Sequence, residues 1–150
     1  MMWQRYCRAT GSDPSSLLAV EHFGDSVEMA DQLLGLVLSG TKSATACLAQ
    51  DYTEAGEELP RAGGHWIIVD GQGAPRCVVR SVDVRLGLLA SVDDAFAHDE
   101  GEGERTRDWW LDAHRRFFTR RAERGETPFD DERDVVVFER FEVVWTESYG

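Results

Sequence analysis

The chain has 150 residues, the length of one ordinary domain, and 42% of them are hydrophobic. Its formal net charge of −12 at pH 7 argues against a protein that grips a long nucleic-acid duplex, because a basic face supplies most of that affinity. The three cysteines are odd in number and lack CxxC spacing, which argues against a disulfide framework or a zinc knuckle. Free thiols favour a reducing compartment.

No stretch approaches the ~20 apolar residues that a membrane span needs. The N-terminal segment MMWQRYCRATGSDPSS lacks the apolar core of a secretory signal. We therefore expect a cytoplasmic protein with no membrane partner. Residues 1–19 are expected to form a loosely ordered arm, and residues 20–147 the folded domain.

The first predicted element is a helix that begins after Ser26, a typical N-cap, and carries apolar residues at helical spacing as far as Leu38. Gly40 stands where a glycine commonly ends a helix. Residues 43–49 are expected to form a short strand, and residues 54–64 a loop.

Two strands follow, over residues 65–70 and 76–84, joined by the glycine-rich turn GQGAP. Ser91 with Asp94 resembles a capping box and predicts a short helix as far as Ala97.

Thr106 begins a longer predicted helix that ends near Arg124. The last strand, residues 134–145, is apolar on both faces, which is typical of a central strand. Because helices and strands do not alternate regularly along the chain, the fold class is α+β.

The segment LSGTKSATA, residues 38–46, holds the chain's single lysine, whereas every other basic residue apart from histidine is an arginine. Unlike arginine, Lys42 can lose its proton when it is desolvated, and a base of this kind can activate the hydroxyl of Thr45. Lys42 is equally well interpreted as a cation at the end of a helix. The residues alone leave both interpretations open.

Four carboxylates crowd residues 99–104, and such crowding raises the pKa of at least one of them toward neutrality, as a general acid requires. A solvated acidic loop is the alternative. The spacing of His98 and His114 is not diagnostic of a metal, so we expect neither a metal site nor a cofactor.

Arginines gather on the long predicted helix at positions that include Arg116. Asp112 precedes Arg116 by four residues, so an ordinary ion pair along the helix explains part of this stripe. A surface that faces RNA is the alternative.

Several segments together resemble the ASCH-domain family over residues 20–146. They are FGDS, LSGTKSATA, GGHWIIVDGQGAP, FAHDEGEGERT, WWLDAHRRFF and VVVFERFEVVW. The most specific part is G-x-K-x-x-T after a helix. The resemblance implies a small mixed β-barrel of PUA-like type with flanking helices.

The resemblance also implies a cleft, and a role in RNA-related processes. Some members of the family are amidohydrolases that remove the acyl group of N4-acylated cytidine with a lysine, a threonine and a glutamate. By motif, Lys42 and Thr45 match directly; Glu100 is the expected acid, with Glu102 as the close alternative. Where the family motif often continues to an arginine, this chain has Cys47.

In the mechanism that the resemblance implies, Lys42 takes the proton of Thr45, which attacks the acyl carbonyl, while Glu100, with a raised pKa, protonates the leaving amine. Direct attack by water is equally consistent. The residues expected to contact the substrate are Glu102, His98, Trp110, His114 and Arg116. The alternative function is a module that binds single-stranded RNA, with ribonuclease activity as an option.

Overall fold

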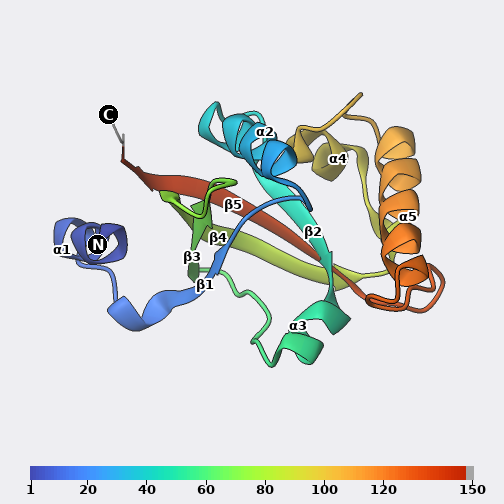
Figure 1. Cartoon of the computed structure of the whole chain (residues 1–150), viewed down its shortest axis with the longest axis horizontal. Coiled ribbons are helices and arrows are strands. Elements are labelled where there is room, and N and C mark those ends of the chain that lie inside the picture. The colour runs from blue at the N-terminus through green and yellow to red at the C-terminus, as the bar shows by residue number, and fades with distance from the viewer. Residues whose placement is uncertain (148–150) are drawn as a thin grey trace.

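A mixed five-stranded sheet, curled into a half-barrel, is the centre of the computed structural model, which describes residues 1–147 (Figure 1). The strands lie in the order β1-β3-β4-β5-β2. Their bounds are β1 Leu17–Glu21, β2 Ala44–Leu48, β3 His65–Val69, β4 Pro75–Gly87 and β5 Val136–Thr146.

Helices flank the sheet at both ends and above it (Figure 1). The α-helices are α1 Met2–Thr10, α2 Val27–Leu38, α3 Ala49–Ala55, α4 Asp94–Glu100 and α5 Arg107–Glu123. Two short 3₁₀ helices, η1 Pro14–Ser16 and η2 Leu89–Ser91, precede β1 and α4. No helix within residues 1–147 has the length and apolar character needed to cross a membrane.

The curl of the sheet comes from its two long strands. β1 pairs with β3 in parallel, and every other pairing is antiparallel. The register between β4 and β5 shifts at Val78/Val79 and again at Ser81/Asp83. Such bulges bend a strand and strengthen its twist, so the sheet folds over and gains an inner face.

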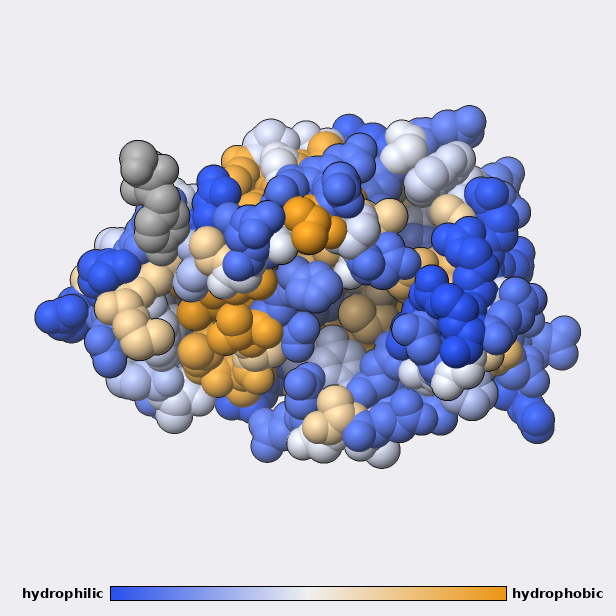
Figure 2. All heavy atoms as spheres, in the orientation of Figure 1, coloured by the Kyte–Doolittle hydropathy of each residue, from blue (hydrophilic) through white to orange (hydrophobic). Residues whose placement is uncertain are grey.

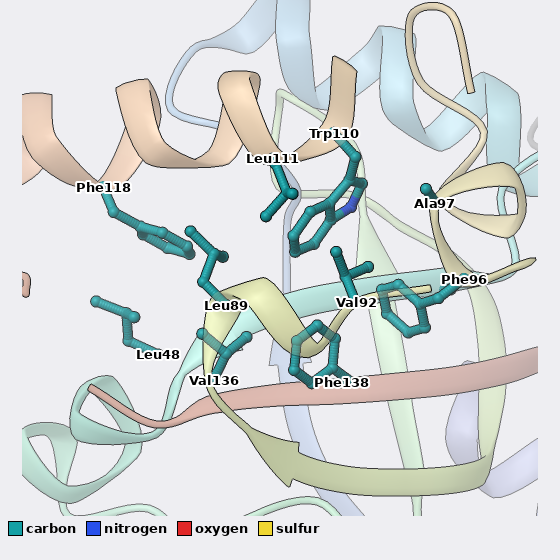
Figure 3. Close-up of a cluster of buried hydrophobic side chains, with 11 residues drawn as sticks. Leu48, Leu89, Val92, Phe96, Ala97, Trp110, Leu111, Phe118, Val136 and Phe138 are labelled. Carbon is teal, nitrogen blue, oxygen red and sulfur yellow. The ribbon is translucent and has the colours of Figure 1, made fainter. Parts of the chain in front are cut away.

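Each face of the sheet has its own core. On the outer face, Trp110, Leu111 and Phe118 of α5 point toward Val136 and Phe138 of β5 (Figure 3). On the inner face, α2 packs against β3, β4 and β5 through a cluster that includes Leu34, Trp66 and Phe141. Because side chains alternate along a strand, Phe138 faces one core and Glu139 faces the other side of the sheet.

The N-terminal segment differs from the loosely ordered arm that the sequence predicted. Residues 2–10 form α1, whose Met2 and Tyr6 are buried against Ile67 and Val78. The Tyr6 hydroxyl is 2.9 Å from His65 Nε2. Met2 and Tyr6 are four residues apart and so share one helical face, which the sequence analysis overlooked. β1 also begins at Leu17, before the expected domain boundary.

Most other predicted elements are confirmed. Ser26 caps α2 by accepting the Met29 N–H, and Gly40 has the expected positive φ of 82°. Thr106 caps α5, and β5 lies between β4 and β2 inside the sheet. The helix after β4 was placed wrongly: Asp93 rather than Ser91 caps α4, and α4 continues to Glu100. Helix α3 was not predicted.

Candidate functional site

Lys42 lies in the short connection between α2 and β2, and only 2% of its surface is exposed. Its backbone N–H donates to the Leu36 carbonyl at 3.0 Å, so the turn after α2 directs the side chain inward. Nζ donates to the Ala44 carbonyl at 2.9 Å and to Glu102 Oε2 at 3.0 Å, and lies 3.4 Å from Glu100 Oε1. The chain's single lysine is therefore a buried cation between two carboxylates.

Gly101 makes this arrangement possible. It ends α4 with a φ of 74°, which favours glycine, and a Cβ at this position would lie 2.5 Å from the Thr41 carbonyl oxygen. The Ser43 N–H donates to the Asp99 carbonyl at 2.7 Å. The end of α4 is thus held against residues 41–43, and the acids before and after Gly101 both reach Lys42.

Glu100 has further partners on α5. The Trp110 indole N–H donates to Glu100 Oε2, and His114 Nε2 lies 3.2 Å from the same oxygen. His114 Nδ1 lies 2.9 Å from the Trp110 carbonyl oxygen, and the two rings stack at 3.8 Å. Because both His114 nitrogens face oxygen acceptors, this geometry favours the imidazolium form, in which both nitrogens donate.

The charges in this cluster stabilise one another. Burial lowers the Lys42 pKa, but the attraction of Glu100 and Glu102 outweighs it and raises the pKa above its ordinary value. Burial raises the Glu100 pKa, but Lys42 and His114 together bring it below its ordinary value. Burial likewise lowers the His114 pKa, and Glu100 more than restores it.

These directions correct two expectations. The raised pKa of Lys42 favours its protonated form over a neutral base ready to accept the proton of Thr45, and the pKa of Glu100 is lowered rather than raised. The physical reason is that Glu100 lies within ion-pair distance of both Lys42 and His114. Of the two carboxylates, Glu102 is the accessible one, with 29% of its side chain exposed against 3% for Glu100.

Thr45 is separate from the Lys42 cluster. It lines a cavity of about 410 Å³ on the inner face of the sheet. The surface is hollowed on this face of the molecule, and the rim of the hollow is mostly hydrophilic (Figure 2). Aromatic and polar side chains line the cavity, among them Phe23, Thr45, Tyr52, Trp66, Ser81 and Glu139.

The cavity and the Lys42 cluster adjoin each other through Phe23. The Phe23 ring lines the cavity, and its centroid is 5.3 Å from Lys42 Nζ. Lys42 and Glu102 do not line this cavity themselves. Lys42 precedes β2 and Thr45 lies within it; Thr45 lines the cavity together with Phe23, and Phe23 also contacts Lys42.

The predicted substrate contacts lie in different surroundings. Glu102 binds Lys42, whereas Trp110 and His114 lie behind Glu100, with Trp110 buried in the outer core. His98 is exposed and lies beside Asp99 and Arg105. Arg116 is exposed and pairs with Asp112 at 2.8 Å. The structure thus brings Lys42, Glu100, Glu102, Trp110 and His114 together, and leaves His98 and Arg116 at the surface.

The arginine stripe on α5 is largely neutralised by acids. Arg115 pairs with Asp131, Arg116 with Asp112, Arg121 with Asp51, and Arg124 with Glu126. The Arg121 contact, at 2.8 Å, also ties α5 to α3. Within residues 1–147, no group of three or more His, Cys, Asp or Glu side chains is arranged to hold a metal ion.

Sequence analysis missed Glu139, which is a buried acid in the cavity. Glu139 is directly opposite Thr45 on the neighbouring strand and accepts a hydrogen bond from the Ser81 hydroxyl. Burial raises its pKa above the ordinary value. The available signal was a charged residue within the apolar run VVVFERF, which is unusual in a central strand.

Comparisons with known proteins agree with this architecture. The ASCH domain family model matches residues 19–145. A high-resolution crystal structure of an ASCH domain from Lactobacillus crispatus JV V101 is 28% identical with a TM-score of 0.79, covering 95% of this chain and 91% of that one. A crystal structure of a protein from Enterococcus faecalis V583 is 35% identical with a TM-score of 0.79, covering 95% of this chain and 85% of that one.

A search of curated proteins finds no match. The family match spans most of the chain, and the two crystal structures share the curled mixed sheet and its flanking helices. The resemblance stated from the sequence is confirmed, and so is the α+β fold class predicted from the order of helices and strands. The chain belongs to the ASCH domain family.

Proposed function

We propose that this protein is an amidohydrolase that acts on a small N4-acylated cytidine-type nucleoside. The observation that carries the proposal is the single lysine, Lys42, buried with two carboxylates beside a cavity whose wall includes Thr45. A buried cluster of charges next to a concave site is a feature common to catalytic sites.

The cavity fits a neutral aromatic ligand of nucleoside type. Its volume of about 410 Å³ lies within the usual range for small-molecule sites. Phe23 and Trp66 offer aromatic surfaces on which a base can stack. The charged side chains that line the cavity are mostly acidic: Glu21, Asp51, Glu57, Glu58 and Glu139, with Arg121. An anionic phosphate is therefore disfavoured, and an uncharged nucleoside is compatible.

The charges suggest how each residue acts. Glu102, the accessible carboxylate, takes a proton from water, whose oxygen attacks the acyl carbon. The protonated Lys42 stabilises the negative charge that develops on the carbonyl oxygen, and the Thr45 hydroxyl orients the acyl group. Glu102 then gives the proton to N4, the C–N bond breaks, and cytidine and a carboxylic acid are released. This mechanism requires the acyl group to lie beside the Phe23 ring, which lines the cavity and whose centroid is 5.3 Å from Lys42 Nζ.

This assignment moves the acid–base role from Glu100 to Glu102. Glu100 is enclosed by Lys42, Trp110 and His114, so it holds Lys42 in its charged form and in its orientation. Glu102 bonds the same lysine and is partly open to solvent.

Binding of single-stranded RNA is the alternative, and two observations disfavour it at this site. The cavity lining is acidic, and four arginines of the α5 stripe already pair with protein carboxylates. A site that holds RNA by its phosphates would show an affinity that falls steeply with salt.

Hydrolysis of N4-acetylcytidine by the purified protein, followed by ultraviolet absorbance, tests the proposal. We expect turnover by the wild type and a loss of about 100-fold or more in kcat for Glu102→Gln, because removal of a general base typically costs 10²–10⁴-fold. Thr45→Val, which removes only the hydroxyl, is expected to reduce turnover less.

His98→Gln is the matched control, because His98 is an exposed polar residue close in sequence to Glu102 and makes no contact with Lys42. Its turnover should equal that of the wild type. Full activity in Glu102→Gln would remove the assigned base. An inactive wild type, together with salt-dependent binding of short single-stranded RNA, would favour the alternative.

A further inference from the structure

Glu139 is a buried carboxyl group without a positive partner. Only 4% of its surface is exposed, and within residues 1–147 no lysine, arginine or histidine lies within ion-pair distance of it. Ser81 donates its hydroxyl hydrogen to Glu139 Oε2. A buried carboxyl group is costly unless its oxygens have hydrogen-bond partners. Glu139 lines the cavity, so a bound ligand can supply a partner for its remaining oxygen.

A second polar atom lies beside it. The Trp66 indole Nε1 is buried and has no hydrogen-bond partner of good geometry in the described part of the chain, although it is near enough to Glu139 to lower its pKa. Trp66 is nine-tenths buried and lines the same cavity. The cavity wall therefore presents an acceptor, the Glu139 carboxyl, and an unsatisfied donor, the Trp66 N–H, close together.

The position of Glu139 relative to Thr45 indicates how a ligand bound to Glu139 would be oriented in the cavity. The two residues are direct partners across the antiparallel pair β2–β5, so their side chains are neighbours on one face, roughly 5 Å apart at Cβ. A ligand N–H bound to Glu139 therefore lies within reach of Thr45, together with whatever group is attached to that nitrogen.

We propose that Glu139 is the specificity-determining residue of this cavity, and that it binds the amide N–H of a planar N-acylated ring. The inference rests on the proposed function, and it identifies the amide N–H as the feature of the substrate that the protein recognises. An N4-acylcytosine offers an N–H donor next to the ring acceptor N3, which complements an acceptor and a donor on the protein. The acyl carbonyl on the same nitrogen then lies toward Thr45.

The electrostatics of the cavity are consistent with this ligand. Burial raises the Glu139 pKa, with Ser81 and Trp66 opposing the shift, so the proton stays on more readily than on an exposed acid. A protonated carboxyl group donates to N3 and accepts from N4–H, whereas the ionised form accepts only. Phosphates and carboxylates are negatively charged, and the acidic lining of the cavity disfavours them.

The test is a binding cycle that changes the protein and the ligand separately. The parent protein is the Glu102→Gln variant, which prevents turnover under the proposed mechanism. The second protein is this parent with the additional substitution Glu139→Met. The ligands are N4-acetylcytidine and its N4-methyl derivative, which lacks the N–H. Isothermal titration calorimetry gives the four dissociation constants.

We expect Glu139→Met to weaken binding of N4-acetylcytidine by at least about tenfold, because a charged or buried hydrogen-bond partner is lost. Methylation of the ligand should weaken binding to the parent protein by a similar factor, but add little once Glu139 is Met. Glu139→Gln keeps a donor and an acceptor in the same place, and should bind within about threefold of the parent. Circular dichroism establishes that each variant is folded.

The outcomes separate this inference from the proposed function. Equal affinities in the parent and a folded Glu139→Met protein would overturn the role of Glu139, even if the wild type hydrolyses the substrate. The inference would also be overturned if the affinity losses from Glu139→Met and from methylation of the ligand were independent and simply multiplied, or if the parent protein did not bind N4-acetylcytidine. If the four dissociation constants follow the expected pattern but the wild type does not hydrolyse the substrate, Glu139 is supported as the residue that binds the N–H and the amidohydrolase activity is rejected.

Discussion

Two glutamates, Glu100 and Glu139, are almost equally buried, yet their surroundings give them opposite properties. Glu100 faces Lys42, His114 and Trp110, and its pKa is lowered by the two cations despite burial. Glu139 accepts a hydrogen bond from the uncharged Ser81 hydroxyl and has no cation within ion-pair distance among residues 1–147, and its pKa is raised by burial. Desolvation acts on both in the same direction, so the presence or absence of a cation decides the outcome.

This contrast gives the carboxyl groups of Glu100 and Glu139 different roles. The Glu100 cluster is a fixed arrangement of charges that keeps Lys42 protonated and oriented. Glu139 is a group that holds its proton more readily than an exposed acid, and it lines a cavity where a ligand can bind. Burial alone would not have distinguished them.

The largest effect on this contrast should come from Lys42→Met, which removes the cation but keeps an unbranched side chain only one atom shorter. Glu102 then loses its cation and Glu100 keeps only His114, so two acids lie close together with less compensation, and we expect the free energy of unfolding to fall by about 3–5 kcal/mol near neutral pH. Urea denaturation measures the change. The loss should shrink at lower pH, where the acids become protonated.

Arg116→Met is the matched control, since Arg116 is an exposed cation in a surface pair with Asp112. Its effect on the free energy of unfolding should be below about 1 kcal/mol. Similar losses in the two variants would mean that the Lys42 cluster is no more than an ordinary ion pair.

A smaller and more specific effect separates Glu100→Gln from Glu139→Gln. Glu100→Gln should reduce the free energy of unfolding by about 1–3 kcal/mol at neutral pH, because Lys42 and His114 lose a charged acceptor. The Glu100 contribution is present above its unfolded pKa and is lost as pH falls through its lowered folded pKa. The variant should therefore approach the wild type in acid.

Glu139 should show the reverse dependence. Its folded pKa is raised, so its contribution to stability is fully present below the unfolded pKa and is lost as pH rises through the folded pKa. Glu139→Gln should therefore become more stable relative to the wild type as pH rises from about 4 to about 8. Denaturation curves at several pH values measure both variants, and parallel curves for the two would contradict the contrast.

The smallest expected effect comes from Ser81→Ala. Ser81 donates to Glu139 and opposes the rise in its pKa, so its removal should raise that pKa further. The accompanying loss in the free energy of unfolding should be about 1 kcal/mol. Carbon-13 NMR of the carboxyl groups measures the titration, with Glu100, which does not contact Ser81, as an internal reference. An unchanged Glu139 titration would show that the hydroxyl does not act on the carboxylate.

Local patterns predicted much of the fold. The apolar spacing and cap of α2, the hairpin of β3 and β4, the cap of α5 and the interior position of β5 follow from short-range features of the sequence. Helix α1 was missed because its apolar face is only two turns long and its partners, on β3 and β4, are distant in the sequence. The cap of α4 was placed two residues early because Ser91 and Asp93 are both suitable caps.

The site was predicted less completely, since it depends on contacts over long sequence separations. The sequence predicted that the lone lysine, Lys42, and the acids Glu100 and Glu102 belong to one cleft, and the structure brings both acids to Lys42. Local crowding of acids suggested a raised Glu100 pKa, whereas the lowered pKa comes from His114 and Lys42, which only the folded chain brings near. The pairing of Thr45 with Glu139 likewise depends on the register of β2 against β5, which the sequence does not specify.

Gly101 has a consequence for natural variation and for engineering. A single added methyl group at this position would overlap the backbone at Thr41 and Lys42, in a conformation that other residues rarely adopt. Such a change would alter no charge and no polar side chain, yet it would separate α4 from the segment that carries the lysine. An alanine at the centre of this Glu-Gly-Glu tripeptide is therefore expected to displace both acids from Lys42, although every charged side chain would remain in the sequence.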